Sequence, residues 1–163
     1  MKGNAKLLAE LNKLLAEELT AINRYMLHAE MCANWGYSRL HKAIEKQAMD
    51  EMHHAEWLIE RILFLDGIPQ VSKLNPMQIG KTVPEMIKIG HDDELGAVKS
   101  YNAAVLLARE AKDQASVDLL TKILKMEEGH VDWAEMQETV IERSGLENYL
   151  VNQSEGAAEQ GIG

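Results

Sequence analysis

The sequence predicts an all-α protein, a four-helix bundle with one long crossover between its second and third helices and a short fifth helix near the C-terminal end. Apolar residues recur every three or four positions through four long stretches, which is the period of one helix face. All three prolines, at positions 69, 76 and 84, fall in one stretch and leave the rest of the chain free for long helices. We expect one domain over residues 1–151, which is long enough for a full hydrophobic core, and a flexible tail over residues 152–163.

The first two helices are predicted by their caps and by the glycine between them. The first runs from a cap at Asn4 to about Trp35, and Gly36 ends it. The second starts at a cap at Ser38 and runs to about Leu65. Because the turn between them is short, we expect these two helices to lie antiparallel.

The second half of the chain begins with a long loop over residues 66–82. At about 3.3 Å per residue, this loop can carry the chain back to the far end of the bundle, which would make the second and third helices parallel. The third helix is expected over residues 83–111 and the fourth over residues 115–143. Gly145 stops the fourth helix, and residues 146–151 predict one or two further helical turns.

Composition and charge exclude several functional classes. The formal net charge of −9 argues against nucleic-acid binding, which needs a basic face, and suits a protein that attracts cations. Cys32 is the only cysteine, so the chain has neither an intrachain disulfide nor a thiolate cluster for zinc or an Fe–S centre. The N-terminus lacks the apolar run of a signal peptide, and no stretch approaches the roughly 20 apolar residues of a membrane span. We therefore expect a cytoplasmic protein with no nucleic-acid or membrane partner.

Two Glu-x-x-His pairs, Glu51 with His54 and Glu127 with His130, are the strongest chemical signal in the sequence. Residues three apart face the same side of a helix, so each pair can hold one metal ion. The pairs lie 76 residues apart (127 − 51). The repetition predicts a duplicated helical pair built around one shared centre. The same offset relates three further pairs of residues: Glu18 and Glu94, Tyr25 and Tyr101, and Trp57 and Trp133.

Six side chains on the apolar stripes form a candidate metal site. Each lies near the middle of its predicted helix, and the midpoints of four bundled helices meet at one level. Burying ionised carboxylates together is costly unless cations neutralise them. A glutamate from each of two helices and a Glu-x-x-His from each of the other two is the ligand set of ferritin-like di-iron bundles. The six residues are Glu18, Glu51, His54, Glu94, Glu127 and His130.

The ligand types suit Fe(II), Mn(II) or Zn(II) and do not select among them. The alternative is that these charges are solvated, on helices whose inward stripe lies one position away. Two pairs with a common offset make that alternative the weaker one. Tyr25 and Tyr101 follow Glu18 and Glu94 by two helical turns, and two interpretations stay open: they hydrogen-bond the ligating carboxylates, or they are amphipathic core tyrosines. For the two tryptophans of the repeat, packing is the better interpretation.

Over about residues 1–151 the chain resembles the bacterioferritins, the haem-containing branch of the ferritins. The likeness is carried by LNKLLAEELTAINRYMLHAEM, NWGYSRL, DEMHHAEWLIERILFLDG, EEGHVDW and GLENYL. It implies two iron ions per subunit, one for each half of the repeat, with Glu51 and Glu127 bridging them. By this resemblance, the first iron is bound by Glu18, Glu51 and His54, and the second by Glu94, Glu127 and His130.

The resemblance also implies an activity and partners. In this family Fe(II) is oxidised in pairs, with O2 or H2O2 as the electron acceptor. The ferric mineral collects inside a hollow homo-oligomeric shell of twenty-four subunits arranged as two-fold dimers, which stores and detoxifies iron. A ferredoxin that drives iron release is an expected partner on the same ground.

Met52 is the second residue that the resemblance singles out. It lies about 100° round the helix from Glu51, so it cannot face the metal ions. In bacterioferritins this methionine and its symmetry mate ligate one b-type haem across a two-fold interface, and a thioether is a competent haem ligand. The chain departs from the family at Lys46, where many members carry a histidine that pairs with an acid at the position of Asp50. This departure argues against an auxiliary iron site on the cavity side, and against the internal electron-supply route that depends on it.

Other functional classes make distinguishable predictions. A haem-binding or structural shell subunit, whose centre holds zinc or stays idle, would carry the same residues. Peroxide-reducing rubrerythrin-like enzymes share the double Glu-x-x-His but usually carry a four-cysteine iron domain, which a single cysteine excludes. DNA-protecting mini-ferritins place their iron site between subunits, and a complete ligand set within one chain argues against that class.

Overall fold

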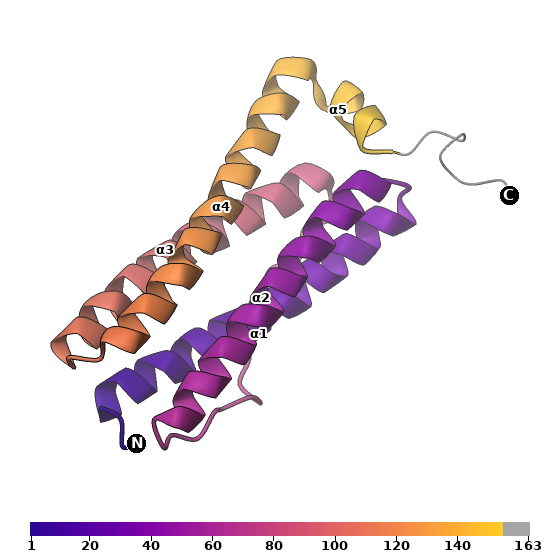
Figure 1. The fold of residues 1–163 in the computed structure, drawn as a ribbon. Helices are drawn as coiled ribbons and strands as arrows, with labels where there is room; N and C mark the ends of the chain where they lie inside the picture. Colours follow the sequence, from indigo (N-terminus) through magenta and orange to yellow (C-terminus); the bar gives the residue numbers. More distant parts are fainter. Residues whose placement is uncertain (155–163) are drawn as a thin grey trace, which may run out of the picture.

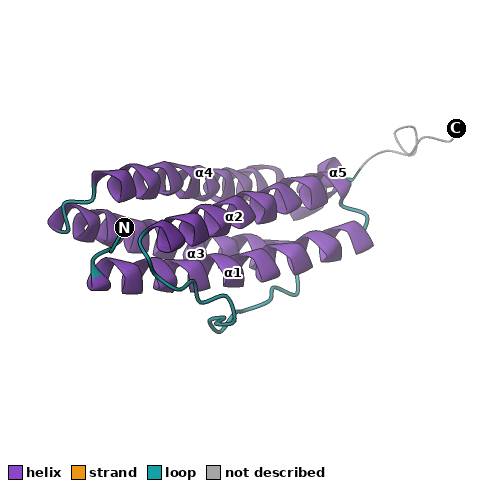
Figure 2. Cartoon of the chain, turned by 60° about the horizontal axis from the view of Figure 1, so that its bottom comes forward, coloured by secondary structure: helices purple, strands orange, loops and turns teal. Residues whose placement is uncertain are grey.

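A computed structural model of the chain describes residues 1–154, which form five α-helices and confirm the predicted bundle (Figure 1). One antiparallel pair is formed by α1 and α2, and a second by α3 and α4. The loop over residues 65–82 runs along the outside of the bundle (Figure 2), so that α2 and α3 are parallel, as expected. The helices are α1 (Ala5–Asn34), α2 (Ser38–Phe64), α3 (Val83–Glu110), α4 (Gln114–Ser144) and α5 (Leu146–Gln153).

The helix ends agree with the sequence to within one residue, except that the cap of α2 and the end of α5 differ. The side chain of Asn4 accepts hydrogen bonds from two backbone amides of the first turn of α1, as a cap should. Gly145 ends α4 with a φ of 82°, a conformation that suits glycine. The predicted cap at Ser38 is wrong: Ser38 is the first residue of α2, and Tyr37 before it makes no side-chain capping bond.

The C-terminal boundary is also later than expected. The flexible tail was expected over residues 152–163, but Asn152 and Gln153 belong to α5. Residues 155–163 lie outside the described part of the chain. None of the described helices is both long enough and apolar enough to span a membrane.

Two apolar clusters fill the two ends of the bundle and leave a polar layer between them. One contains the first half of α1 and the last turns of α2, with buried side chains such as Leu11 and Leu58. The other contains the second half of α1 and the start of α2, with Ala29 and Ile44. Packing in these two clusters fixes the four long helices against one another at both ends. The middle segments of the four helices therefore lie at the same level of the bundle.

The crossover loop is fastened along α1 by side chains of that helix. Asn12 donates to the carbonyl of Ile68, and its own oxygen accepts from the backbone amide of Gln70. Further along α1, the buried ring of His28 accepts from the backbone amide of Gly80 at 3.0 Å. These bonds satisfy three backbone groups of the irregular loop and hold it against α1.

Candidate metal centre

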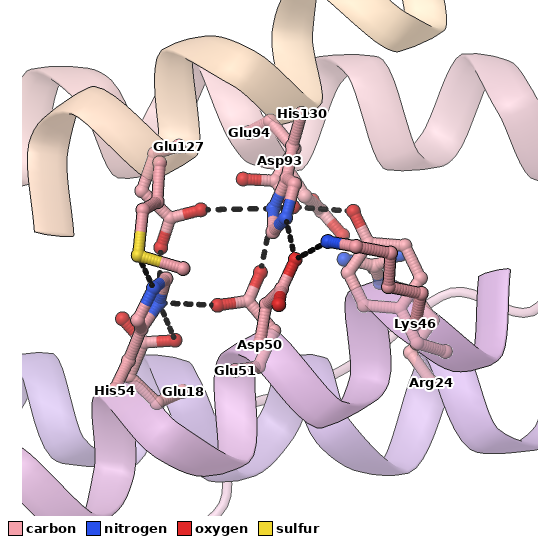
Figure 3. A network of polar contacts seen from close by, with 12 residues as sticks. Glu18, Arg24, Lys46, Asp50, Glu51, His54, Asp93, Glu94, Glu127 and His130 are labelled. Atoms are coloured by element: carbon pink, nitrogen blue, oxygen red, sulfur yellow. Dashed lines mark hydrogen bonds and ion pairs between the residues drawn. The ribbon is translucent and has the colours of Figure 1, made fainter. Parts of the chain in front are cut away.

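The middle of each long helix contributes charged side chains to the buried polar layer. Figure 3 shows these side chains converging from all four helices. None of the six is more than 7% exposed. The structure thus brings together all six residues that the sequence predicted as metal ligands: Glu18 on α1, Glu51 and His54 on α2, Glu94 on α3, and Glu127 and His130 on α4.

Carboxylates surround the Nδ1 atom of His54. It lies 2.8 Å from Oε2 of Glu51, 3.2 Å from Oε1 of Glu127 and 3.6 Å from Oε2 of Glu18. The ligand atoms of these four residues lie within 4.8 Å of one another. They form a group compact enough to enclose one cation.

The second group is built in the same way around Nδ1 of His130. This atom lies 3.2 Å from Oε1 of Glu51, 3.3 Å from Oε2 of Glu127 and 3.5 Å from Oε1 of Glu94. The ligand atoms of these four residues also lie within 4.8 Å of one another. Glu51 and Glu127 belong to both groups, and each directs one oxygen to each imidazole.

Two atoms of the layer are left without a hydrogen bond. Among the described residues, Oε2 of Glu127 and Nδ1 of His130 are buried and have no hydrogen-bond partner, although they lie 3.3 Å apart. Buried polar atoms are nearly always satisfied in native proteins. A cation between these two atoms would satisfy both, so the donor set fits a metal ion.

Protons stabilise this layer when no cation is bound. Burial, with repulsion from neighbouring carboxylates, raises the pKa of Glu127 to about 8 and raises the pKa of Glu51 well above its ordinary value. Burial alone would lower the pKa of His54, but hydrogen bonds to the surrounding carboxylates outweigh it and raise that pKa to about 12. The pKa of His130 is also raised against the effect of burial, by the carboxylates of Glu127, Glu51 and Glu94 close to its ring. Metal ions must therefore displace protons when they bind.

Two buried tyrosines hold the outer carboxylates across the bundle. Tyr25 on α1 donates to Oε1 of Glu94 on α3, and Tyr101 on α3 donates to Oε1 of Glu18 on α1. Burial, the largest cause, raises the pKa of each phenol, so both stay protonated donors. Of the two interpretations that the sequence left open, hydrogen bonding to the carboxylates is the one that the structure shows.

The outer nitrogens of the two imidazoles meet different partners. Nε2 of His130 donates to Oδ2 of Asp50 at 3.1 Å, and the same oxygen accepts from Nζ of Lys46 at 2.9 Å. Nε2 of His54 lies 3.3 Å from Sδ of Met126. A proton on Nε2 leaves Nδ1 of each ring free to bind a metal ion. The ammonium of Lys46 lies against Asp50, where an auxiliary cation would have to bind.

A cavity of about 270 Å³ reaches the centre from the side of α1 and α3. Beyond the four glutamates of the centre its lining is rich in acidic residues, a charge that attracts cations. Among them is Asp93, which pairs at 2.9 Å with the buried Arg24. The guanidinium of Arg24 also lies over the ring of Tyr25, 4.2 Å from its centroid. The outer lining is formed by Glu17, Thr20, Ala21, Arg24, Asn75, Pro76, Asp92, Asp93, Gly96, Ala97 and Ser100.

The sequence reasoning missed Arg24 and Met126. No pattern in the sequence marks Arg24, because a lone arginine beside a tyrosine on a helix is common. Met126 could have been found, because the offset of 76 maps Asp50 onto it.

Met52 lies outside the metal centre, on α2, and is partly exposed. Large apolar side chains are also exposed on the same helix, at Met49, and on its partner α1, at Met26 and Leu27. Within the described part of the chain nothing covers these side chains. The two helices therefore expose large apolar side chains of the kind that often mark an interaction surface.

The fold and the buried layer define a class of protein: a ferritin-like four-helix bundle whose carboxylates and imidazoles form two adjacent metal-ligand groups. The family model of the ferritin-like domain matches residues 8–144. The bacterial ferritin of Synechocystis sp. is 43% identical over 154 residues, which cover 94% of this chain and 99% of the relative. The bacterial ferritin of Paramagnetospirillum magnetotacticum is 38% identical over 152 residues (92% and 93%). The bacterioferritin of Brucella melitensis is 37% identical over 149 residues (91% and 92%). The chain belongs to the ferritin family.

Membership of the family confirms the predicted resemblance and the predicted function. The protein stores iron, and ferroxidase activity is general for the family. The relatives also support the expected homo-oligomeric storage shell.

Proposed function

We propose that the buried polar layer is the ferroxidase centre of this ferritin. The observation that carries the proposal is the sharing of two carboxylates, Glu51 and Glu127, between two four-residue ligand groups. This arrangement holds two cations side by side with bridging ligands. In the proposal, one Fe(II) is bound by Glu18, Glu51 and His54, and the other by Glu94, Glu127 and His130.

The pairing of the two groups matches the electron count of the reaction. Two Fe(II) ions give up two electrons when both become Fe(III). That number reduces O2 to H2O2, or H2O2 to two waters, with two protons taken up in either case. Four carboxylates favour the higher charge of Fe(III) over that of Fe(II), and the two tyrosines hold the outer carboxylates in place. The acidic cavity on the side of α1 and α3 supplies the Fe(II) substrate.

Glu18→Ala tests the assignment, because Glu18 serves one ligand group only. We expect fast Fe(II) oxidation, followed by stopped-flow absorbance of the ferric product, to be abolished while sedimentation shows an intact shell. Glu10→Ala, a glutamate on the same helix that pairs with Lys13 at the surface, is the matched control and should oxidise Fe(II) as the wild type does. Wild-type oxidation kinetics in Glu18→Ala would overturn the assignment.

The same experiment addresses a shell whose centre holds zinc or stays idle. The ligand set accommodates Zn(II) as well as Fe(II). Metal analysis of the protein as isolated should find iron, and added Fe(II) should be oxidised at a rate that depends on the centre. Tightly held zinc together with slow, Glu18-independent oxidation would favour that alternative.

For haem, the proposal is that Met52 and its symmetry mate ligate one b-type haem between two subunits. It is supported by the partial exposure of Met52 and by the uncovered apolar side chains on α1 and α2. Met52→Leu should remove the haem absorption bands of the purified protein. Met49→Leu, on the same helix and equally apolar, is the control and should retain haem. Full haem content in Met52→Leu would rule out this ligand.

The assembly and partners complete the proposal. We propose a shell of twenty-four subunits built from two-fold dimers, acting in the cytoplasm, with a ferredoxin as the electron donor for iron release. The uncovered apolar surface of α1 and α2 supports the dimer. Sedimentation velocity should show one large species, and a monomer or dimer at working concentration would contradict the shell.

A further inference from the structure

The internal repeat relates the two ligand groups, yet it does not relate the partners of their imidazoles. Nε2 of His130 donates to the Asp50 carboxylate, whereas Nε2 of His54 meets the Met126 thioether. Position 126 is position 50 plus the repeat offset of 76. The same structural place therefore holds an anion in one half of the chain and a neutral sulfur in the other.

The partner of the outer nitrogen determines how strongly an imidazole binds a cation through its inner nitrogen. A carboxylate that accepts the Nε2 proton fixes the ring and raises the basicity of Nδ1. Removing such a partner typically weakens metal binding by about 10–100-fold. A thioether is a weak acceptor and carries no charge. Met126 therefore does little to fix the His54 ring or to raise the basicity of its Nδ1 atom.

Lys46 fixes Asp50 without cancelling its effect. Its Nζ lies 2.9 Å from the oxygen that accepts from His130, one helical turn away on α2. The lysine side chain is 75% exposed while Asp50 is 17% exposed. Solvent therefore screens the ammonium charge, and the carboxylate faces the imidazole with most of its own charge.

We infer that the two metal subsites are inequivalent: the His130 subsite binds divalent cations more tightly than the His54 subsite and fills first, by about tenfold in affinity. Asp50 and Lys46 are its positioning residues. The inference rests on the proposed metal centre. It follows that the dependence of oxidation rate on Fe(II) concentration reports the weaker, His54 subsite, because two ions are needed to supply two electrons.

Variants that keep one subsite each separate this inference from simple repulsion between two bound ions. His54→Ala leaves the His130 subsite, and His130→Ala leaves the His54 subsite. Assembled, metal-free shells of each are titrated with Co(II), followed by its visible absorption. We expect one ion per chain in both, with a Kd about tenfold lower in His54→Ala.

Two matched second substitutions test the cause of the difference. Asp50→Asn in the His54→Ala protein keeps an acceptor but removes the charge, and should weaken Co(II) binding by about tenfold. Met126→Leu in the His130→Ala protein should change the Kd by less than about threefold, since a weak acceptor is lost.

The role of Asp50 can also be tested by itself in the intact centre. Crystals of the wild type with one Co(II) per chain should show anomalous signal mainly at the His130 subsite, and Asp50→Asn should even out the two signals.

Three outcomes would overturn the inference. Equal Kd values in the two single-subsite variants would do so, as would equal responses to Asp50→Asn and Met126→Leu, or equal anomalous occupancy in the wild type. Failure of the wild type to bind two Co(II) ions per chain would have a different meaning. That result would overturn the proposed metal centre itself, and the inequivalence with it.

Discussion

Glu127→Gln should stabilise the metal-free protein, because the layer that binds metal ions is costly to bury without them. Glu127 is 1% exposed. Burial, with repulsion from Glu18 and Glu94, raises its pKa from 4.5 to about 8. At pH 7 the folded protein must therefore hold a proton that the unfolded chain has released. Over the roughly 2.5 pH units between 4.5 and 7 this costs up to about 3 kcal/mol.

The sign of the pH dependence follows from the raised pKa. The cost is absent below about pH 4.5, where both states are protonated, and grows as the pH rises towards 8. Glutamine does not ionise, so the Glu127→Gln variant does not have this free-energy cost. We expect Glu127→Gln to be more stable than the wild type by about 2–3 kcal/mol at pH 7 and by less than about 1 kcal/mol at pH 5. For a chain of this length the shift in Tm at pH 7 is on the order of 5–10 °C.

Differential scanning calorimetry of chelator-treated protein measures this difference. Wild type and variant are compared at equal concentration, because assembly contributes to the apparent stability. Glu128→Gln, at the exposed neighbouring position, is the control and should show no pH-dependent gain. Added Zn(II) should reverse the order, since the wild type keeps the full ligand set. A variant that melts below the wild type at pH 7, or a difference that is the same at both pH values, would refute the reasoning.

Three further predictions concern single contacts. Tyr101→Phe removes the donor to Glu18 and should lower the stability of the metal-free protein by about 1–3 kcal/mol in thermal melts. His28→Gln should make the free energy of unfolding less dependent on pH between pH 6.5 and 4. Burial and a nearby arginine lower the pKa of His28 to about 4, so in this range only the unfolded chain takes up the proton. The wild type therefore loses about 2–3 kcal/mol of unfolding free energy, which the variant should keep. Gly80→Ala should cost about 1–3 kcal/mol, because its Cβ would lie 2.6 Å from the backbone nitrogen of Met86.

Each of these predictions has its own contrary result. Tyr37→Phe, outside the polar layer, is the control for Tyr101→Phe, and equal melting of those two variants would remove the role given to the Tyr101 bond. For His28, an acid limb in the His28→Gln protein as steep as in the wild type would show that another group titrates there. A Gly80→Ala protein as stable as the wild type would mean that the crossover loop moves freely away from α3.

The residues of the ligand layer could be predicted from the sequence because their pattern is unusual. Charged side chains at positions of an apolar stripe are unusual, and the common offset of 76 made the pattern specific. Helical periodicity then fixed which side of each helix they occupy. Helix limits followed from the cap at Asn4 and the glycine at Gly145, whereas the cap expected at Ser38 did not form.

What could not be predicted depends on how helices are rotated and paired in space. That Tyr25 bonds Glu94 rather than Glu18 is set by the packing of α1 against α3. The predicted cap of α2 was wrong because the backbone conformation of Tyr37 places the start of the helix at Ser38. The contact of Met126 with His54 is likewise a result of the packing of α4 against α2, which periodicity along one helix does not contain.

The two shared carboxylates also constrain how this chain can change by descent. Each half of the repeat supplies three residues of one ligand group and takes the fourth, Glu127 or Glu51, from the other half. A mutation at either glutamate removes a ligand from both groups at once. Neither hairpin by itself contains a complete ligand group. Selection acts on the two copies as one inherited unit.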